Sequence, residues 1–313
     1  MPLTDVSAEP GTLTVSEEFG YKYRLFHGVC YPPFINSKVD TLMESFQLRE
    51  SDVVIATFPK CGTTWMQQIV LLLFNDGDPS KVRDPMKMSP WLDRMVCADE
   101  TFTVDYLDKM PLEPRRVWKT HAPEQLAPWR GGTKTGLAAG SKVIVVVRNP
   151  KDCAFSLWHH ARDLECFAYT GDFDHLTRIF LDGMVEHGDF FAWHTGWWAA
   201  HQADPEHIFW VSYEELKRDL QGQISRIASF LGLDASPELV ARVAAASDFG
   251  AMKQQFAVVD AEKAARGEYV KKNHIRVGES GTWRSTFTDE QSARFDQAAS
   301  TRLAHANGLR FEY

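Results

Sequence analysis

The stretch with the clearest chemical potential combines a cation, a glycine and two hydroxyl groups, at Lys60, Gly62, Thr63 and Thr64. An apolar run at 53–57 precedes these residues, and apolar residues at helical spacing follow them. The pattern predicts a buried strand, a tight loop and a helix. The first N–H groups of a helix lack internal partners and carry the positive end of its dipole, so such a junction attracts anions. The loop therefore predicts a phosphate-binding site.

This loop departs from the nucleotide-binding P-loop, in which Lys directly follows the second of two glycines. Here Lys60 stands two positions before Gly62, the only glycine of the loop. That order weakens a nucleoside-triphosphate assignment, and an ordinary strand–helix turn with a solvated lysine stays open. Cys61, at a helix N-terminus, is a candidate nucleophile. The favoured interpretation of Cys61 is a small residue that fits a tight turn.

Other polar residues follow other predicted strands. Further strands are expected at 116–121, 142–147 and 207–211. Because helices alternate with these strands, we predict an α/β fold with a central parallel sheet that helices flank on both faces. Ligands of such sheets bind at the carboxyl ends of the strands. Four candidate residues fall just past those ends, namely Lys60, His121, Arg148 and Tyr213.

The expected helices differ in how clearly the sequence marks them. Apolar spacing predicts helices at 63–73, 151–162, 174–181, 190–201, 220–231, 237–246 and 289–307. The segment 250–283 is polar and shows no sustained period, so we predict a long functional or disordered loop there. No repeat or linker divides the chain, which predicts a single domain over 1–313 with a loosely ordered segment at 1–20.

Composition narrows the classes of protein that this chain can be. Its 34 Lys and Arg against 42 Asp and Glu give a net charge of −8, which disfavours nonspecific nucleic-acid binding. The five cysteines form no CxxC pair, so we expect reduced thiols and no structural zinc site. No apolar run reaches membrane-spanning length, and the N-terminus lacks signal-peptide features, so we expect a cytoplasmic protein without a membrane partner.

Four motifs taken together resemble the cytosolic sulfotransferases. They occur in family order over most of the chain: TFPKCGTTW at 57–65, KTH at 119–121, VRNPKD at 147–152 with Ser156, and RVG at 276–278 continuing to GTW at 281–283. The resemblance implies a P-loop-like sulfotransferase fold. It also implies sulfuryl transfer from 3'-phosphoadenosine 5'-phosphosulfate (PAPS) to an acceptor hydroxyl or amine, by direct in-line displacement and without a metal.

The resemblance implies a role for each matching residue. The 5'-phosphosulfate would be held by Lys60, Cys61, Gly62, Thr63 and Thr64. The 3'-phosphate would be held by Arg148, Ser156, Arg276, Val277 and Gly278. An arginine fork suits a phosphate dianion better than an ammonium group does. The adenine would be bound by Trp65, Tyr213, Ser247 and Phe249.

The same resemblance places the reaction at three side chains. His121 would be the general base that takes the proton of the acceptor hydroxyl, and a near-neutral imidazole suits that task. Lys60 and Lys119 would stabilise charge on the leaving oxygen and the transferring group. Two alternatives stay open: a P-loop kinase of a small molecule, which would need ATP and magnesium, and a non-catalytic nucleotide-binding protein of the same fold.

The chain departs from the family pattern near its C-terminal motif. Val277 and Arg284 stand where the family often has Lys, and Thr282 stands where it often has Asp. Losing the cation at Val277 leaves Arg148 and Arg276 as the main holders of the 3'-phosphate, so we expect weaker cofactor binding. A dimer signature near residue 287 is not matched, which leaves a monomer or a homodimer open.

Other chemically suggestive residues support weaker hypotheses. His187, His194 and His201 recur every seven residues, but glycines interrupt that segment, and a mixture of surface and pocket histidines is favoured over a metal site. His159 and His160 are expected on a plain helix surface rather than in the acceptor pocket. Abundant aromatic residues favour a phenolic or other hydrophobic alcohol as the acceptor. Loops at 26–35, 90–95 and 250–272 are expected to shape its pocket.

Overall fold

The central sheet is the core of the molecule. The computed structural model describes residues 13–15, 19–98, 101–111, 115–268 and 276–313. Within them a parallel sheet has the strand order β5-β4-β6-β7, and its strands are β4 (Val53–Thr57), β5 (Val117–Thr120), β6 (Lys142–Val147) and β7 (Ile208–Ser212). In the register, Val54 lies between Trp118 and Val143. These strands confirm the α/β sheet predicted from the sequence.

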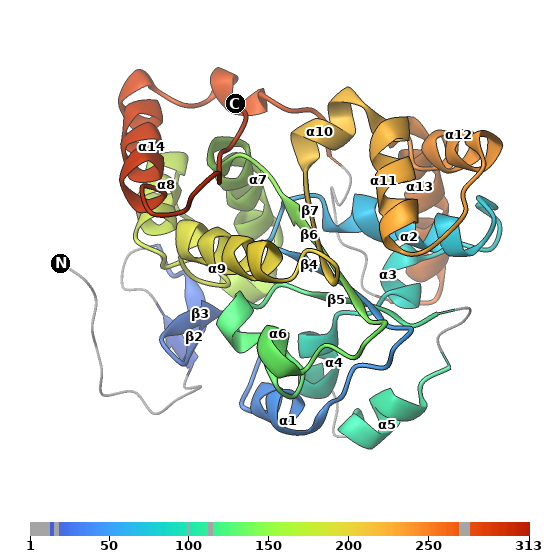
Figure 1. The fold of residues 1–313 in the computed structure, drawn as a ribbon. Coiled ribbons are helices and arrows are strands. Elements are labelled where there is room, and N and C mark those ends of the chain that lie inside the picture. Colours follow the sequence, from blue (N-terminus) through green and yellow to red (C-terminus); the bar gives the residue numbers. More distant parts are fainter. Residues whose placement is uncertain (1–12, 16–18, 99–100, 112–114, 269–275) are drawn as a thin grey trace.

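Helices cover both faces of this sheet, as predicted (Figure 1). Alternate residues of β6 face opposite cores: Val143 and Val145 join one buried cluster, and Ile144 joins the other. The second cluster packs α2 (Thr63–Phe74), α10 (Tyr213–Arg218), α11 (Leu220–Phe230) and α12 (Pro237–Ala246) against the sheet. The first packs α7 (Pro150–Asp163), α8 (Phe173–Leu181), α9 (Phe190–Ala203) and α14 (Asp289–Arg302). The strands are apolar on both sides because both faces are buried.

A second, smaller sheet was not predicted. Its strands, in the antiparallel order β1-β2-β3, are Leu13–Val15, Lys22–Phe26 and Val29–Tyr31. His27 and Gly28 connect β2 to β3 and have φ of 48° and 77°. Two consecutive left-handed residues form the tight turn that matches the twist of a hairpin. Of the N-terminal segment predicted to be loose, 1–12 and 16–18 lie outside the described residues.

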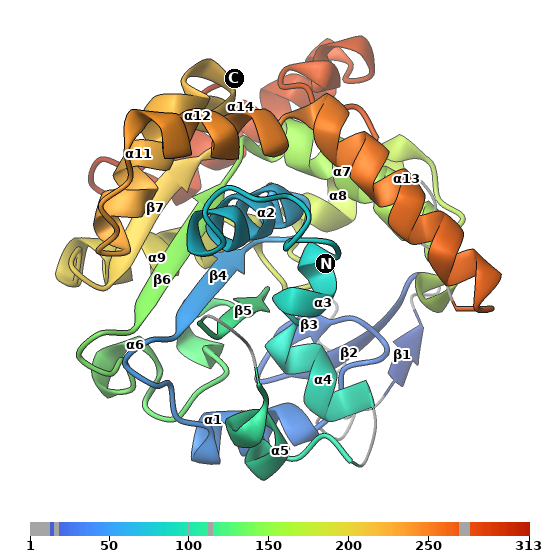
Figure 2. The ribbon, with the colours of Figure 1, turned by 90° about the vertical axis from the view of Figure 1, so that its right-hand side faces the viewer.

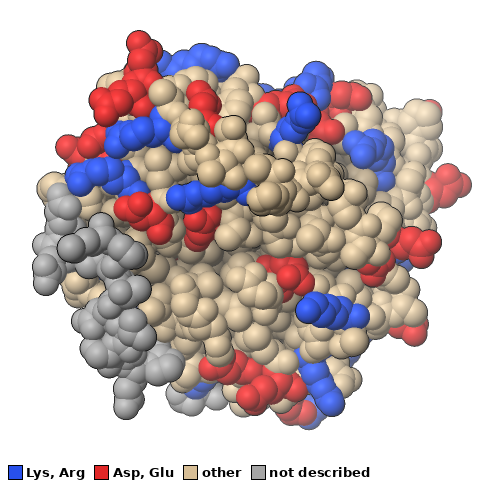
Figure 3. Space-filling model, turned by 60° about the vertical axis from the view of Figure 1, so that its left-hand side comes forward, with Lys and Arg blue, Asp and Glu red and all other residues tan. Residues whose placement is uncertain are grey.

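The remaining helices are shorter or lie at the periphery. They are α1 (Lys38–Ser45), α3 (Pro85–Met88), α4 (Leu92–Ala98), α5 (Val104–Lys109), α6 (Gly132–Thr135) and α13 (Phe249–Ala265). Figure 2 shows α13 crossing one side of the molecule, with β1, β2 and β3 below it. No helix in the described ranges is long and apolar enough to cross a membrane. Basic and acidic side chains are interspersed on the face that Figure 3 shows.

The prediction of a long loop at 250–283 was wrong over its first half. Residues Phe249–Ala265 form α13, whose N-cap Asp248 accepts a hydrogen bond from the Gly250 amide. Its buried residues are Met252, Phe256 and Val259, spaced as one narrow helix face. Good helix formers fill the other positions, so the helix needs only this narrow apolar stripe to dock. Residues 269–275 lie outside the described residues.

The helices α14 and α9 also differ from the prediction. The last helix, α14, ends at Arg302 and not at residue 307. Gly196 does not interrupt α9, which continues through it to Ala203. A single glycine inside a helix costs only about 1 kcal/mol relative to alanine, and the buried aromatic face of α9 offsets that cost.

Candidate active site

The loop between β4 and α2 has the geometry of an anion-binding cradle. Lys60 and Gly62 both lie in the left-handed region, with φ of 71° and 105°. A Cβ at Gly62 would come within 3.0 Å of the Tyr213 ring, so both the backbone angle and the space favour glycine there. Gly62 is the N-cap of α2 and supplies no capping side chain. The first amides of α2 are therefore placed to face a ligand.

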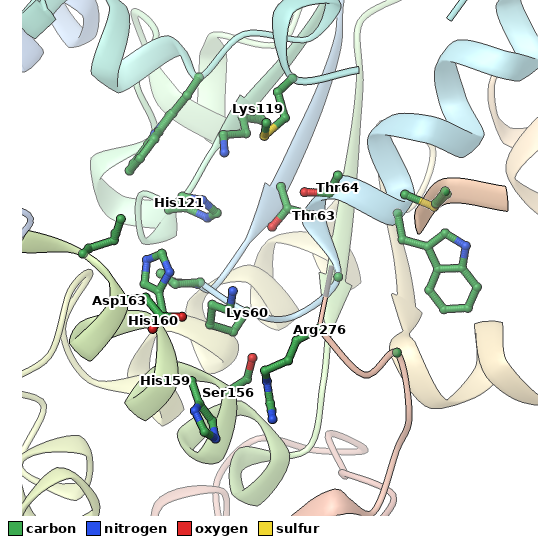
Figure 4. Close-up of a pocket in the computed structure, with 18 of the residues that line it drawn as sticks. Lys60, Thr63, Thr64, Lys119, His121, Ser156, His159, His160, Asp163 and Arg276 are labelled. Atoms are coloured by element: carbon green, nitrogen blue, oxygen red, sulfur yellow. The ribbon is translucent and has the colours of Figure 1, made fainter. Parts of the chain in front are cut away.

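One cavity of about 1060 Å³ adjoins this loop (Figure 4). Every site residue predicted from the sequence lines it except Cys61: Lys60, Gly62, Thr63, Thr64, Trp65, Lys119, His121, Arg148, Ser156, Tyr213, Ser247, Phe249, Arg276, Val277 and Gly278. Cys61 is buried behind the loop, with its Sγ 3.8 Å from the Sγ of Cys153. That position fits a small structural residue better than a nucleophile facing a substrate.

Aromatic rings line one end of the cavity, which we call the nucleotide end. The rings of Trp65 and Tyr213 lie 5.2 Å apart at 65°, and the Trp65 indole donates to the backbone carbonyl of Ser247 at 2.8 Å. Gly278, at φ 71°, lies against Phe249, where a Cβ would come within 2.1 Å of the ring. The backbone at Gly278 can therefore pack against Phe249 only because the residue lacks a side chain.

Two arginines concentrate positive charge at this end. Arg148 is 8% exposed and lies over the Tyr213 ring, and its Nη2 donates to the carbonyl of Glu279 at 2.7 Å. Burial, and then the charge of Arg148, lowers the pKa of Arg276. Among the described residues, the buried Nε of Arg148 has no hydrogen-bond partner. A bound dianion would both relieve the repulsion between the arginines and accept these donors.

His121 is fixed in the orientation that a general base needs. Its Nδ1 lies 2.8 Å from the backbone carbonyl of Thr57 and 3.1 Å from the Thr57 hydroxyl. A carbonyl oxygen only accepts, so Nδ1 carries the proton and Nε2 carries the lone pair. The Thr57 hydroxyl also contacts the Thr63 hydroxyl at 2.7 Å. His121 is thereby linked through Thr57 to the first residue of the cradle helix.

Two of the lysines that line the cavity, Lys60 and Lys119, are desolvated by burial. Burial, and then the charge of Arg94, lowers the pKa of Lys119 to about 8. Burial also lowers the pKa of Lys60. The Lys119 ammonium lies 4.8 Å from the centre of the Trp91 ring. Both cations face a low-dielectric space, where they act more strongly on a developing negative charge than they would in water.

The segment 90–95, predicted as a loop, lies beside these catalytic candidates, but α4 begins within it at Leu92. The Lys119 amide donates to the Pro90 carbonyl at 3.0 Å, so this segment runs alongside β5. The Trp91 and His121 rings are consequently 4.8 Å apart. Phe34, Met95, Ala98, Phe102 and Leu164 add apolar surface to the same region. We call this region the acceptor end of the cavity.

Comparison with known proteins identifies the family. A family model described as a sulfotransferase domain matches residues 50–307. The chain belongs to the sulfotransferase family. Mouse sulfotransferase 2B1 is 32% identical over 300 residues, which cover 93% of this chain and 83% of that protein. The protein is therefore an enzyme of sulfuryl transfer, as the four motifs predicted, and the kinase alternative loses its support.

Solved structures share the fold of this sulfotransferase. Mouse SULT7A1, complexed with PAP, has a TM-score of 0.71 and 24% identity, covering 91% of this chain and 96% of that chain. Retinol dehydratase, in complex with androsterone and the inactive cofactor PAP, has a TM-score of 0.76 and 23% identity, covering 96% of this chain and 92% of that chain. The predicted sulfotransferase fold is confirmed by these likenesses.

Asp152 is a site residue of the sulfotransferase whose role the sequence did not reveal. Its carboxylate accepts hydrogen bonds from the Gly281 amide at 2.6 Å, the Thr282 hydroxyl at 2.9 Å and the Trp283 amide at 3.1 Å. It also lies 3.9 Å from Arg148. Although burial opposes it, the charge of Arg148 and these bonds hold the pKa of Asp152 below its usual range. Asp152 therefore fixes the segment 281–283 to the start of α7.

The prediction that His159 and His160 lie on a plain helix surface was wrong. Both line the cavity, and Nε2 of His160 lies 3.1 Å from Oε1 of Glu186. The sequence signal was present, because Ser156 and His160 are four residues apart and so share a face of α7.

The three evenly spaced histidines take different structural positions. His187 and His194 are buried, and burial lowers the pKa of each to about 3. His201 is partly buried and contacts the Ile208 carbonyl through Nδ1. Among the described residues, no group of three His, Cys, Asp or Glu side chains could hold a metal ion. The favoured interpretation of mixed surface and pocket histidines was wrong here, because His187 and His194 lie in the core and none of the three lines the cavity.

Proposed function

We propose that this sulfotransferase transfers the sulfuryl group of PAPS to the hydroxyl of a phenolic or other hydrophobic alcohol acceptor. The observation that carries the proposal is the link from the cradle to His121 through Thr57. That link sets the imidazole beside an anion-binding helix terminus in one cavity. PAP, the spent form of this co-substrate, is the nucleotide in both solved structures compared above.

Each of the cofactor-binding residues predicted from the sequence would then hold one part of the co-substrate. The amides of Cys61, Gly62, Thr63 and Thr64 would bind the 5'-phosphosulfate, with the threonine hydroxyls as further donors. The 3'-phosphate would lie between Arg148 and Arg276, near Ser156 and the Val277–Gly278 backbone. Trp65, Tyr213 and Phe249 would enclose the adenine, beside Ser247.

The transfer step follows from the same arrangement. Nε2 of His121 takes the proton of the acceptor hydroxyl as that oxygen attacks sulfur. The bond from sulfur to the phosphate oxygen breaks, and Lys60 stabilises the charge left on that oxygen. Lys119 stabilises the transferring group, and both products leave without a covalent enzyme intermediate. The step requires no redox partner.

The apolar walls of the acceptor end support a hydrophobic acceptor. Phe34, Trp91, Met95 and Phe102 would contact its rings, because such sites bury most of a ligand against apolar side chains. An acceptor screen over phenols, sterols and sugars tests this choice, and sulfation of sugars alone would contradict it. We further propose that 1–313 forms a single domain, that the protein is cytoplasmic, and that it acts as a monomer or homodimer.

Calorimetric titration with PAP, compared with ATP and magnesium, tests the co-substrate. We expect tight PAP binding that Arg148→Ala weakens by about ten- to a hundredfold, because hydrogen bonds to charged groups contribute about 1.5–3 kcal/mol. Arg284→Ala is the matched control, since Arg284 is an exposed arginine outside the cavity. ATP binding that is as tight as PAP binding or tighter, and that is unchanged in Arg148→Ala, would contradict the proposal and restore the kinase alternative. PAP binding without any sulfuryl transfer would favour a non-catalytic protein.

A further inference from the structure

Two ionisable side chains in contact, His160 and Glu186, interrupt the apolar wall of the acceptor end. His160 comes from α7, and Glu186 comes from the segment between α8 and α9; their contact is 3.1 Å long. Glu186 is only 3% exposed, yet it lines the cavity. Figure 4 shows His160 among the side chains that surround the cavity together with His121. None of the roles assigned above uses this pair.

The backbone around Glu186 is held in place from two sides. The Glu186 amide donates to the Tyr21 hydroxyl at 3.1 Å, and the next amide, of His187, donates to the Cys30 carbonyl at 2.6 Å. His187 has φ of 67° and is followed by Gly188 at 81°. A left-handed residue that is not glycine costs about 1 kcal/mol or more, and such strain clusters at functional positions. The carboxylate is therefore presented to the cavity from a fixed turn.

Packing alone does not explain a carboxylate at this position. Burying a charged group costs several kcal/mol, and well-packed apolar residues of similar volume often replace a buried ion pair without loss of stability. The charge of Glu186 also reaches the reaction centre, because it opposes the burial that lowers the pKa of Lys60 and of Lys119. A carboxylate that costs stability and faces the acceptor is better explained by recognition.

Resting on the sulfotransferase function proposed above, we propose that the His160–Glu186 pair is a second recognition point for the acceptor. Glu186 accepts a hydrogen bond from a donor group of the acceptor other than the reacting hydroxyl. A carboxylate offers about four acceptor positions on two oxygens, and the contact with His160 is made by one of them, Oε1. The substrate class is a hydrophobic phenol or alcohol that carries a second hydroxyl or an ammonium group. An anionic group at the same place would be repelled.

Matched acceptors test this proposal. The probes share one phenol and differ at the para substituent: 4-ethylphenol, 4-(2-hydroxyethyl)phenol, 4-(2-aminoethyl)phenol and 3-(4-hydroxyphenyl)propanoate. For the wild type we expect kcat/KM to favour the hydroxyethyl or aminoethyl probe over 4-ethylphenol by about tenfold or more, with the propanoate poorest. In Glu186→Met the ratio of kcat/KM for the hydroxyethyl or aminoethyl probe to kcat/KM for 4-ethylphenol should fall toward one.

Two variants identify the donor and control for nearby charge. Glu186→Gln keeps an accepting oxygen and loses the charge, so a preference for the hydroxyl would persist in it, whereas a preference for the ammonium would be lost. Glu165→Gln changes an exposed carboxylate at the same cavity and should keep the wild-type ratios. PAP titration of each variant verifies that the nucleotide end is intact.

The outcomes separate this proposal from the function on which it rests. Sulfation of every phenol at similar kcat/KM, unaffected by Glu186→Met, would overturn the recognition point and leave the sulfotransferase activity standing. Loss of the preference for the hydroxyethyl or aminoethyl probe in both Glu165→Gln and Glu186→Met would also overturn the recognition point. Failure of PAPS to sulfate any probe or any other alcohol would instead contradict the proposed function.

Discussion

The two ends of the cavity are built in different ways. At the nucleotide end, backbone groups at the start of α2 after Gly62 and at Gly278 lie beside side chains such as Arg148 and Tyr213. At the acceptor end, side chains supply the surface, among them Trp91 and Glu186. Backbone amides bind an anion whatever their sequence context, whereas a side-chain wall takes its shape from its own residues. One end therefore serves a fixed co-substrate, and the other can vary with the acceptor.

His121 lies where the two ends meet, so removing it should have the largest effect. We expect His121→Ala to lower kcat by about a hundred- to ten thousandfold, the usual contribution of a positioned base. PAP affinity should change little, because the base contacts the acceptor rather than the nucleotide. Initial rates with labelled PAPS and calorimetry with PAP measure the two effects. Near-normal turnover in the variant would remove His121 from its assigned role.

Asp152 tests whether the nucleotide end depends on residues that do not touch the ligand. We expect Asp152→Asn to weaken PAP binding by about tenfold, since charged hydrogen bonds to the Gly281 and Trp283 amides are lost. Adenosine 5'-monophosphate, which lacks the 3'-phosphate, should bind the variant and the wild type alike. Calorimetry with both nucleotides distinguishes the two. Equal loss for both nucleotides would mean that Asp152 supports the whole fold instead.

The protonation state of Lys119 should make the activity depend on pH. Its pKa of about 8 means that the ammonium form dominates below pH 8 and disappears as the pH rises through that value. Because the charged form stabilises the transferring group, kcat/KM should fall several-fold between pH 7.5 and 9.5. The arginine in Lys119→Arg keeps its charge over this range, so kcat/KM of this variant should fall less at alkaline pH. If kcat/KM of Lys119→Arg fell over this pH range as much as that of the wild type, the titration would belong to another group.

The smallest expected effect concerns Val277, where the family often has Lys. Val277 is 38% exposed and lines the nucleotide end, so a lysine there would meet a solvent-screened 3'-phosphate. We expect Val277→Lys to tighten PAP binding by about two- to fivefold, because exposed ion pairs contribute about 0.2–1 kcal/mol. Titrations at low and high salt measure the gain, which should shrink as salt rises. A gain in PAP affinity that is the same at low and high salt would indicate a packing effect instead.

Sequence reasoning was most successful where the structure repeats a local pattern. The strands at 53–57 and 142–147 are continuous apolar runs, and the helix at 237–246 has the predicted bounds. The residues at their ends line one cavity because parallel strands place their carboxyl ends along the same edge. The roles of those residues stay predictions until the variants above are measured.

The failures share a cause. The helix α13 has an apolar stripe too narrow to stand out from its polar residues, and β1 and β3 are three residues each. Short or weakly patterned elements become stable only when a neighbouring element covers them, so their own residues carry little signal. Asp152 and His160 were missed as functional groups for a related reason, since their partners lie on distant segments.

The sequence by itself determined the parallel sheet, the anion cradle and the set of residues gathered at the strand ends. These features depend on strand burial, helix termini and a few glycine positions, all of which leave local patterns. Only the tertiary structure decided the proton position on His121, the anchoring of 281–283 by Asp152, and the pair of His160 with Glu186. Each of these depends on contacts between segments far apart in the chain, and the packing of the whole domain sets such contacts.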